Sequence, residues 1–290
     1  MAPQVVCLQP IAVVDHVIEG KKENTELLGE GQRVGGSQRV TRQELQTLLV
    51  KAGQFVTNAA GSAANVARSL TAGFEVETRL VGSVGKDEWG AIYLRAMERS
   101  GVDVSLMLEK EGSTGRCAII AHGNERTMRT DMEDAVRLSF EDLKPANLEG
   151  AEWLLLNGYA LYGKDLLQKS IGAAREAGCK VALDLGSFEV VAAHRDEIRG
   201  LIERAEVHLI LGNEDETAEL MKGPKAEETY KAALKYYVDS GVETGVVMMG
   251  SKGCMALAKG RRKTKETREK RERKERENVC VCVCVTEFGD

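Results

Sequence analysis

The 290-residue sequence lacks an apolar run long enough for a membrane-spanning helix, which takes roughly 18 consecutive apolar residues. Its first ten residues, MAPQVVCLQP, also lack the basic start and long apolar stretch of a secretory signal. We therefore expect a cytoplasmic protein with no membrane partner. The 43% of apolar residues can fill a substantial core.

Histidine is scarce, and no pair of histidines has the spacing of metal ligands. The cysteines do not indicate a disulfide framework either. Four of the seven stand singly in apolar segments, as small hydrophobic residues do in proteins of a reducing compartment. The histidines are His16, His122, His194 and His208, and the single cysteines are Cys7, Cys117, Cys179 and Cys254. The other three cysteines alternate with valine over residues 279–285.

An excess of basic charge is confined to one segment of the chain, whose overall net charge is -5. Residues 259–278 hold eleven Lys or Arg and five Glu, so this segment carries +6 and the rest of the chain -11. The segment has no aromatic residue on which a base could stack. We expect a low-complexity, disordered tail over 259–290 and no nucleic-acid partner.

Proline is rare, and no Pro- or Ser-rich linker divides residues 1–258, which we expect to form one domain. Apolar, β-rich runs such as KVALDLG and VHLILGN alternate there with helix-like stretches, which indicates an α/β fold with a parallel sheet. Helix signals support this pattern. Thr41 and Glu44 predict a capping box, Asp87 predicts a helix start, and Gly53 and Gly101 predict helix ends.

Two segments interrupt the alternation. Residues 18–40 are polar and glycine-rich, and residues 116–130 predict a hairpin with Gly123-Asn124 at its turn. We expect the two segments to pair into a small lid that excludes water from a reaction.

The stretch AGSAANVARSLTAGF, residues 60–74, carries the first chemical signal. Its small residues open a helix, where a ligand could approach the backbone, and Asn65 adds an amide for a hydroxylated ligand. Close helix packing also explains such a start. Asp15 strengthens the ligand interpretation, because IAVVD places its carboxylate at the predicted end of the first strand.

Taken in order, Asp15, GGSQRV, GSAANVA, VGSVGKDEWG, GNERTM, LDLGSFE, NEDE and GSKG resemble the motifs of the ribokinase-like, or PfkB, carbohydrate kinase family. The resemblance covers roughly residues 5–258, although AGSAAN departs from the usual double glycine. It implies a three-layer fold, in which helices flank a mostly parallel sheet that carries a β lid. It also implies transfer of the γ-phosphoryl of ATP, with Mg²⁺, to a hydroxyl of a sugar or nucleoside, and allows a homodimer through the lid.

The resemblance assigns roles to individual residues. The substrate-binding candidates are Asp15, Gly35, Gly36, Gly61, Asn65 and Asp184, and the cofactor-binding candidates are Asn213, Glu216, Gly250 and Gly253. Glu216 is also the candidate for Mg²⁺, a hard cation that prefers oxygen ligands. Local structure offers alternatives: Asn213 and Asp184 could be helix caps, and Gly250 could belong to an ordinary turn.

One family motif is absent from residues 1–290. The resemblance implies a loop of the form D-T-x-G-A-G-D after GSKG, whose amides hold the transferring phosphate and whose last Asp accepts the hydroxyl proton. Val/Cys and Arg/Glu alternation is what GT and AG repeats encode, so we expect the kinase reading frame to stop near Ala258. The expected chain is then a C-terminally truncated, inactive kinase. A real regulatory tail, or a non-catalytic sugar-binding protein, is the alternative.

Overall fold

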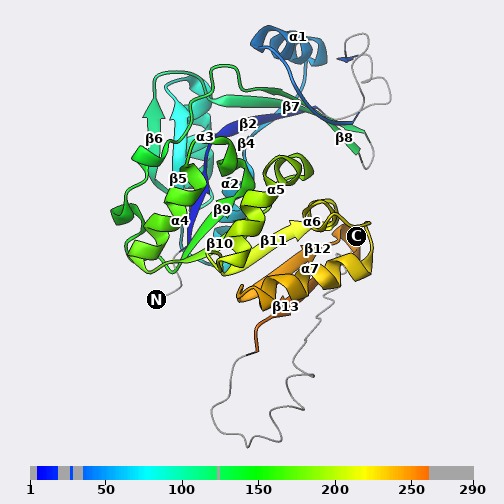
Figure 1. Ribbon diagram of the computed structural model, residues 1–290. Helices are drawn as coiled ribbons and strands as arrows, with labels where there is room; N and C mark the ends of the chain where they lie inside the picture. The colour runs from blue at the N-terminus through cyan, green and yellow to red at the C-terminus, as the bar shows by residue number, and fades with distance from the viewer. Residues whose placement is uncertain (1–4, 19–26, 29–34, 123–124, 261–290) are drawn as a thin grey trace, which may run out of the picture. The chain divides into compact units, whose positions relative to one another are not determined.

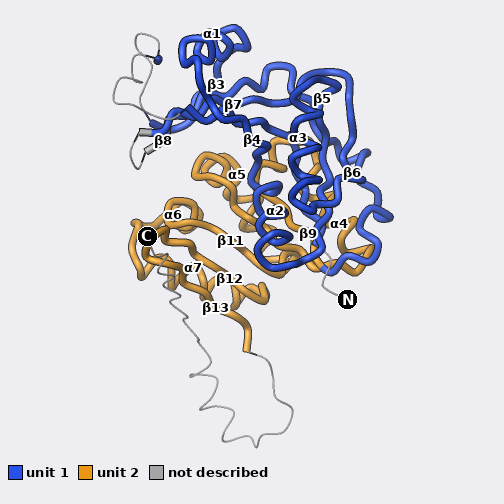
Figure 2. Tube along the Cα trace, turned by 180° about the vertical axis from the view of Figure 1, so that it is seen from behind, with its two compact units in different colours: residues 1–152 blue, residues 153–290 orange. Residues whose placement is uncertain are grey.

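The computed structural model describes residues 5–18, 27–28, 35–122 and 125–260. The chain divides into two compact units, residues 1–152 and 153–290 (Figure 2). This division falls inside the range 1–258 that the sequence assigns to one domain. The predicted hairpin turn at Gly123-Asn124 and the tail from residue 261 onward lie outside the described residues.

Unit 1 contains three parallel strands in the order β1-β5-β6, which are Val5–Gln9, Thr78–Gly85 and Asp103–Lys110. Helix α2, Ser62–Phe74, packs on β1 and β5, and helix α3, Glu88–Arg99, packs on β5 and β6. Asp87 caps α3 by accepting a hydrogen bond from the amide of Gly90, as the sequence predicts.

A second, five-stranded sheet of unit 1 has the order β3-β8-β7-β2-β4. Its strands are β2 Val13–Ile18, β3 Gly36–Arg39, β4 Val56–Ala60, β7 Gly115–His122 and β8 Glu125–Asp131. The β7–β8 and β2–β4 pairs are antiparallel, while β3–β8 and β2–β7 are parallel. The segments predicted as the lid therefore pair through β3, β7 and β8, and β2 and β4 extend the same sheet.

The position of Asp15 differs from the sequence prediction. The apolar run predicted as one strand breaks after Gln9, because Pro10 cannot donate to a strand ladder and the Gln9 side chain donates to the carbonyl of Ile11 at 2.7 Å. Asp15 consequently lies inside β2 of the five-stranded sheet, and not at the end of the first strand.

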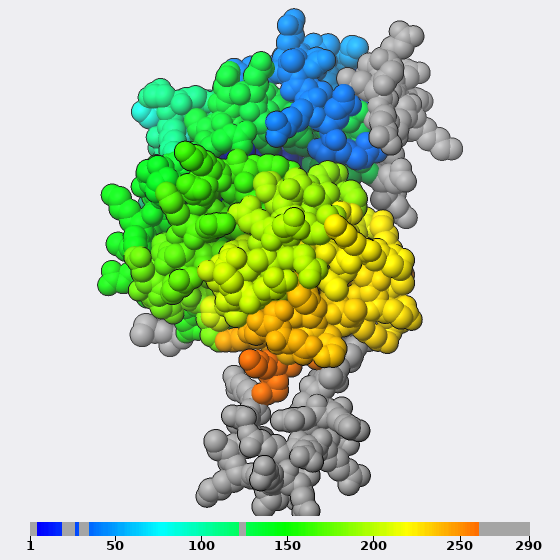
Figure 3. All heavy atoms as spheres, in the orientation of Figure 1, coloured from blue at the N-terminus to red at the C-terminus, as the bar shows by residue number. Residues whose placement is uncertain are grey.

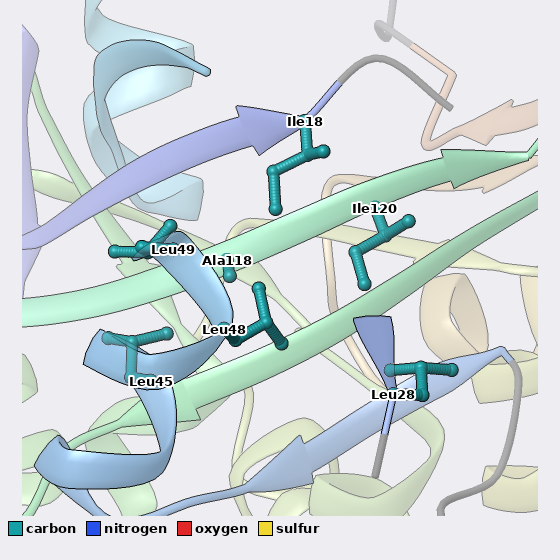
Figure 4. Close-up of a cluster of buried hydrophobic side chains, with 7 residues drawn as sticks. All are labelled: Ile18, Leu28, Leu45, Leu48, Leu49, Ala118 and Ile120. Atoms are coloured by element: carbon teal, nitrogen blue, oxygen red, sulfur yellow. The ribbon is translucent and has the colours of Figure 1, made fainter. Parts of the chain in front are cut away.

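Helix α1, Arg42–Ala52, covers one face of the five-stranded sheet. The predicted capping box is present, since the Thr41 hydroxyl accepts from the Glu44 amide and the Glu44 carboxylate accepts from the Thr41 amide. Gly53 ends the helix with φ +71°. Figure 4 shows the apolar cluster between helix and strands, which consists of Ile18, Leu28, Leu45, Leu48, Leu49, Ala118 and Ile120.

Unit 2 contains the strand order β13-β12-β11-β10-β9, in which only the β12–β13 pair is antiparallel. The strands are β9 Trp153–Asn157, β10 Lys180–Asp184, β11 Leu209–Asn213, β12 Thr244–Met248 and β13 Cys254–Ala258. The helices are α4 Leu166–Ala177, α5 Phe188–Glu203, α6 Glu214–Met221 and α7 Glu227–Asp239 (Figure 1). In Figure 3, side chains of α5, α6 and α7 form a continuous surface of this unit.

Four short 3₁₀ segments complete the described elements, namely Phe140–Asp142, Pro145–Leu148, Gly158–Tyr162 and Gly250–Lys252. The protein has an α/β fold with mixed sheets flanked by helices, as the sequence predicts. Among the described residues, no helix has the length and apolar character needed to cross a bilayer. Cys7, Cys117, Cys179 and Cys254 form no disulfide bonds among the described residues.

Candidate active site

A single cross-strand row organises the polar side chains around Asp15 in unit 1. Register places Asn58 of β4 opposite Asp15 of β2, Asp15 opposite Cys117 of β7, and Cys117 opposite Thr130 of β8. Arg39 of β3 lies opposite Thr130 and ends the row. Residues paired in register project from the same face of a sheet, so this row shares the face of Asp15.

The carboxyl of Asp15 is half-buried among charged neighbours. Burial raises its pKa to about 6, and the guanidinium groups of Arg126 and Arg68 act in the opposite direction. The Arg68 side chain also donates a hydrogen bond to Oδ1 of Asn65 at 2.7 Å. Arg68 thus interacts with both substrate-binding candidates, with Asn65 through a hydrogen bond and with Asp15 through its charge. The sequence predicts these two candidates from separate motifs.

Gly61 has a structural reason to be glycine. It precedes α2 with φ +117°, and a Cβ atom there would lie 2.5 Å from Oε1 of Gln9. That Gln9 oxygen accepts a hydrogen bond from the amide of Ala64 at 3.1 Å and so caps the helix start. Close packing, one of the two interpretations that the sequence leaves open, therefore applies here, and ligand binding by Gly61 stays a prediction.

Gly35 and Gly36 lead into β3 with φ values of +83° and +66°. The amide of Gly35 donates a hydrogen bond of 2.7 Å to the Thr127 hydroxyl, which connects the glycine segment to β8. No heavy atom lies within 4 Å of a Cβ at either position. Their predicted role in substrate binding stays a prediction.

In unit 2, polar residues end neighbouring parallel strands. Asn157 ends β9 and lies in register with Asp184, which ends β10. Asp184 does not cap the next helix, because Ser187 does so by accepting from the amide of Val190; Asp184 instead accepts from the amide of Gly186 at 2.8 Å. The capping alternative for Asp184 is wrong. Burial raises the pKa of its carboxyl.

Asn213 and Glu216 form a reciprocal capping box at the start of α6. Asn213 Oδ1 accepts from the Glu216 amide at 2.9 Å, while the Glu216 carboxylate accepts from the amide and side chain of Asn213, both at 2.8 Å. The helix-cap interpretation of Asn213 is confirmed, and it holds Glu216 beside the strand ends. Burial raises the pKa of Glu216 to about 7; the Asn213 amide lowers it, and the charge of Asp184 raises it further.

Two further residues near Asp184 have no local sequence signal. Asn157 is 2% exposed, its Oδ1 accepts from the amide of Tyr159, and its Nδ2 has no partner among the described residues. Tyr159 is 43% exposed, and it stacks on Tyr162 with ring centroids 6.4 Å apart. The pKa of Tyr159 is raised, first by burial, with contributions from Glu189, Glu216 and Asp184.

The GSKG motif forms a tight turn between β12 and β13. Gly250 and Gly253 both have positive φ, +57° and +85°, and the amide of Met249 donates to the carbonyl of Gly253 at 2.8 Å. No heavy atom lies within 4 Å of a Cβ at Gly250, and the Lys252 side chain is 73% exposed. The turn interpretation is therefore correct, and it leaves open space against the Gly250 backbone.

No group of three or more His, Cys, Asp or Glu side chains close enough to hold a metal occurs in the described part of the chain. Mg²⁺ commonly uses only one or two carboxylates and completes its shell with water and phosphate oxygens. Glu216 is buried and Asp184 half-buried, and the pKa values of both are raised. They fit that requirement, because a cation beside them would offset the cost of their ionisation.

The chain is similar in sequence to known carbohydrate kinases. Residues 37–274 match the model of the "pfkB family carbohydrate kinase". An "uncharacterized sugar kinase" of Archaeoglobus fulgidus is 24% identical over 192 residues, which are 65% of this chain and 72% of that protein.

Solved structures show the same fold. The adenosine kinase from Sinorhizobium meliloti superposes with a TM-score of 0.75 at 20% identity, over 92% of this chain and 82% of that one. A probable sugar kinase from Rhizobium etli also gives a TM-score of 0.75 at 20% identity, over 89% of this chain and 77% of that one.

Proposed function

Because this chain belongs to the pfkB family of carbohydrate kinases, and is thus an ATP-dependent kinase by family, we propose that it binds a sugar through Asp15 and Asn65 as phosphoryl acceptor. The observation that carries the proposal is the polar row on the five-stranded sheet, in which Asp15 lies between Asn58 and Cys117. A carboxylate and neighbouring amides accept and donate hydrogen bonds to vicinal hydroxyls. In this proposal the sheet acts as the lid of the substrate site.

Unit 2 supplies the candidate groups for ATP and Mg²⁺. During phosphoryl transfer, Mg²⁺ binds phosphate oxygens and carboxylates and neutralises their negative charge. The first turn of α6 holds Glu214, Asp215 and Glu216, and three carboxylates repel a triphosphate unless a cation lies between them. We assign Glu216, oriented by Asn213, to Mg²⁺ and its water shell, and the open Gly250 turn to the nucleotide. Such chemistry fits a cytoplasmic protein.

A nucleoside is the second candidate acceptor. The observation that favours it is the aromatic surface of unit 2, where Tyr159, Tyr162 and Phe188 are 43%, 50% and 46% exposed. Aromatic rings stack on nucleobases with a favourable free energy of about 1–3 kcal/mol per base. Adenosine therefore belongs in every ligand panel.

The test of substrate binding is calorimetry on residues 1–290 with Mg²⁺, a non-hydrolysable ATP analogue, and a panel of sugars and adenosine. We expect Asp15→Asn to weaken binding of the ligand about 10- to 100-fold, the value of one charge-assisted hydrogen bond. At pH 8 the same change should raise the free energy of unfolding by about 1 kcal/mol, since it removes a carboxylate that partial burial disfavours.

The sign of this stability effect is fixed by the raised pKa. The gain should shrink as the pH falls through the folded pKa of about 6, and it should vanish below the unfolded value of 3.8, where both states become protonated. Asp196→Asn, an exposed carboxylate of α5, is the control and should change neither quantity. Equal affinity of the parent and Asp15→Asn proteins would remove Asp15 from the substrate site.

A further inference from the structure

Arginines near the two faces of the five-stranded sheet differ in the ion pairs that they form. On the face opposite Asp15, Arg116 lies 3.4 Å from the carboxylate of Asp131, and Arg42 contacts both Asp131 and Asp134. Arg116 also lies over the ring of Trp89, 5.5 Å from its centroid. Arg116 and Arg42 are therefore paired with carboxylates.

The guanidinium groups on the Asp15 face form no close ion pair with a described carboxylate. Register places Arg126 opposite Ala121, four residues along β7 from Cys117, and therefore on the same face as Asp15. Arg68, on α2, acts on the same carboxylate through its charge and donates a hydrogen bond to Asn65. Among the described residues no carboxylate lies within 4 Å of the Arg68, Arg126 or Arg39 guanidinium.

An apolar row lies between these charges. Val17, Ile119 and Met128 pair in register one step along from the Asp15 row, and each is half-buried. A ligand on this face would meet a carboxylate and amides at Asp15, an apolar floor, and guanidinium groups at Arg68 and Arg126. Neutral sugars use only the first of these features, whereas a guanidinium pairs best with a carboxylate or phosphate.

We propose that the substrate is an anionic sugar, whose hydroxyls bind Asp15 and whose phosphate or carboxylate binds Arg68 and Arg126. This inference rests on the proposed function and narrows its substrate class. Arg39, at the far end of the Asp15 row, is placed to attract the same anion at longer range. Two guanidinium groups against one carboxylate leave a net positive charge for the ligand to neutralise.

Calorimetry on residues 1–290 tests the inference with four acceptors: D-fructose, D-fructose 6-phosphate, D-gluconate and adenosine. We expect at least one of the two anionic sugars to bind about tenfold or more tightly than D-fructose and adenosine, with an affinity that falls between 50 and 300 mM salt. The phosphorylated sugar and the sugar acid are separate arms, so the result identifies the source of the anion.

The variants Arg68→Met and Arg126→Met keep the apolar stem and remove the charge. Each should weaken the anionic sugar about 10- to 100-fold, a larger loss than for the neutral ligands. Arg95→Met is the matched control, because Arg95 is an exposed arginine of α3 away from this face. Thermal unfolding of each variant checks that the fold is retained.

The outcomes separate the two proposals. If D-fructose or adenosine binds at least as tightly as the anionic sugars, or if both Arg variants behave like Arg95→Met, the anionic substrate is wrong while sugar binding stands. If none of the four acceptors binds although the ATP analogue does, both the anionic substrate and the assignment of Asp15 are wrong.

Discussion

At Gly61 two independent constraints exclude a side chain. Its φ of +117° lies in a region that L-residues rarely adopt, and the Gln9 amide occupies the position of a Cβ atom. The Gln9 oxygen caps α2, so a displaced Gln9 would also leave the Ala64 amide unpaired. This glycine fixes where α2, and with it Asn65 and Arg68, begins.

We predict that Gly61→Ala lowers the free energy of unfolding by about 2–4 kcal/mol, from backbone strain together with a lost cap. Gly73→Ala in the same helix is the control, because its φ is ordinary and nothing lies within 4 Å of a Cβ there. That change should stabilise the protein by about 0.5–1 kcal/mol. Urea unfolding measures both, and a Gly61→Ala protein as stable as its parent would contradict the packing argument.

At the scale of elements, local motifs were predictable and long-range pairings were not. The Thr41–Glu44 and Asn213–Glu216 capping boxes each lie within four residues, so their sequence pattern predicts the observed hydrogen bonds. Asp15 depends instead on β2 pairing with β7, about a hundred residues along the chain. An apolar run contains no signal for such a partner, so the sequence predicts one strand up to Asp15 and not two strands separated at Pro10.

Arg68 and Arg126 illustrate the same limit at the candidate site. Each is one arginine among many in the sequence, and only the folding of β8 and α2 brings both close to Asp15. Asn157 is similar, since its burial and its register with Asp184 become visible only in the folded sheet. The sequence thus indicates the motif residues of the candidate site and not the charges around them.

Helix α6 supplies a prediction about pH. Because the pKa of Glu216 is raised to about 7 in the folded protein, the folded state binds this proton more tightly than the unfolded chain. Its contribution to stability is largest below about pH 4.5 and is lost as the pH rises through 7. We expect Glu216→Gln to reduce the loss of stability between pH 5 and pH 8 by on the order of 1–3 kcal/mol.

Chemical denaturation across that pH range measures the slope for the parent and the variant. Mg²⁺ with the ATP analogue should also flatten the slope of the parent, since a cation near Glu216 favours the ionised carboxylate. The Glu216→Gln protein should lack this Mg²⁺ effect. Identical slopes for both proteins, with and without Mg²⁺, would remove Glu216 from the predicted metal site.

At the scale of the whole molecule, the candidate residues for substrate and for cofactor lie in different units. Unit 1 contains the substrate candidates Asp15, Asn65 and Arg68, and unit 2 contains the cofactor candidates Asn213, Glu216 and Gly250. A homodimer through the five-stranded sheet and a disordered tail over 259–290 stay predictions. The same is true of the general base, for which residues 1–290 offer no D-T-x-G-A-G-D loop.

The last prediction concerns turnover by the polypeptide of residues 1–290. Loss of a general base typically costs about 10²- to 10⁴-fold in rate, and loss of one donor to the developing charge costs about 10²- to 10³-fold. Groups that act as a unit are not additive, so we expect a combined deficit near 10⁴-fold. ADP release with Mg²⁺, ATP and the sugar panel measures it against a chimera whose tail, from residue 259, is replaced by a family C-terminal segment with the aspartate loop.

A third protein, the same chimera with Asn in place of the loop aspartate, tests whether the proton acceptor accounts for the difference in rate. It should retain substrate binding and lose about 10²- to 10⁴-fold of the chimera's rate, because only the proton acceptor is changed. Activity confined to the intact chimera would show that unit 1 and unit 2 form a competent binding scaffold that lacks its base. Comparable turnover by residues 1–290 would contradict this prediction and would place the base on Asp15, Asp184 or Asp290; burial already raises the pKa of the first two.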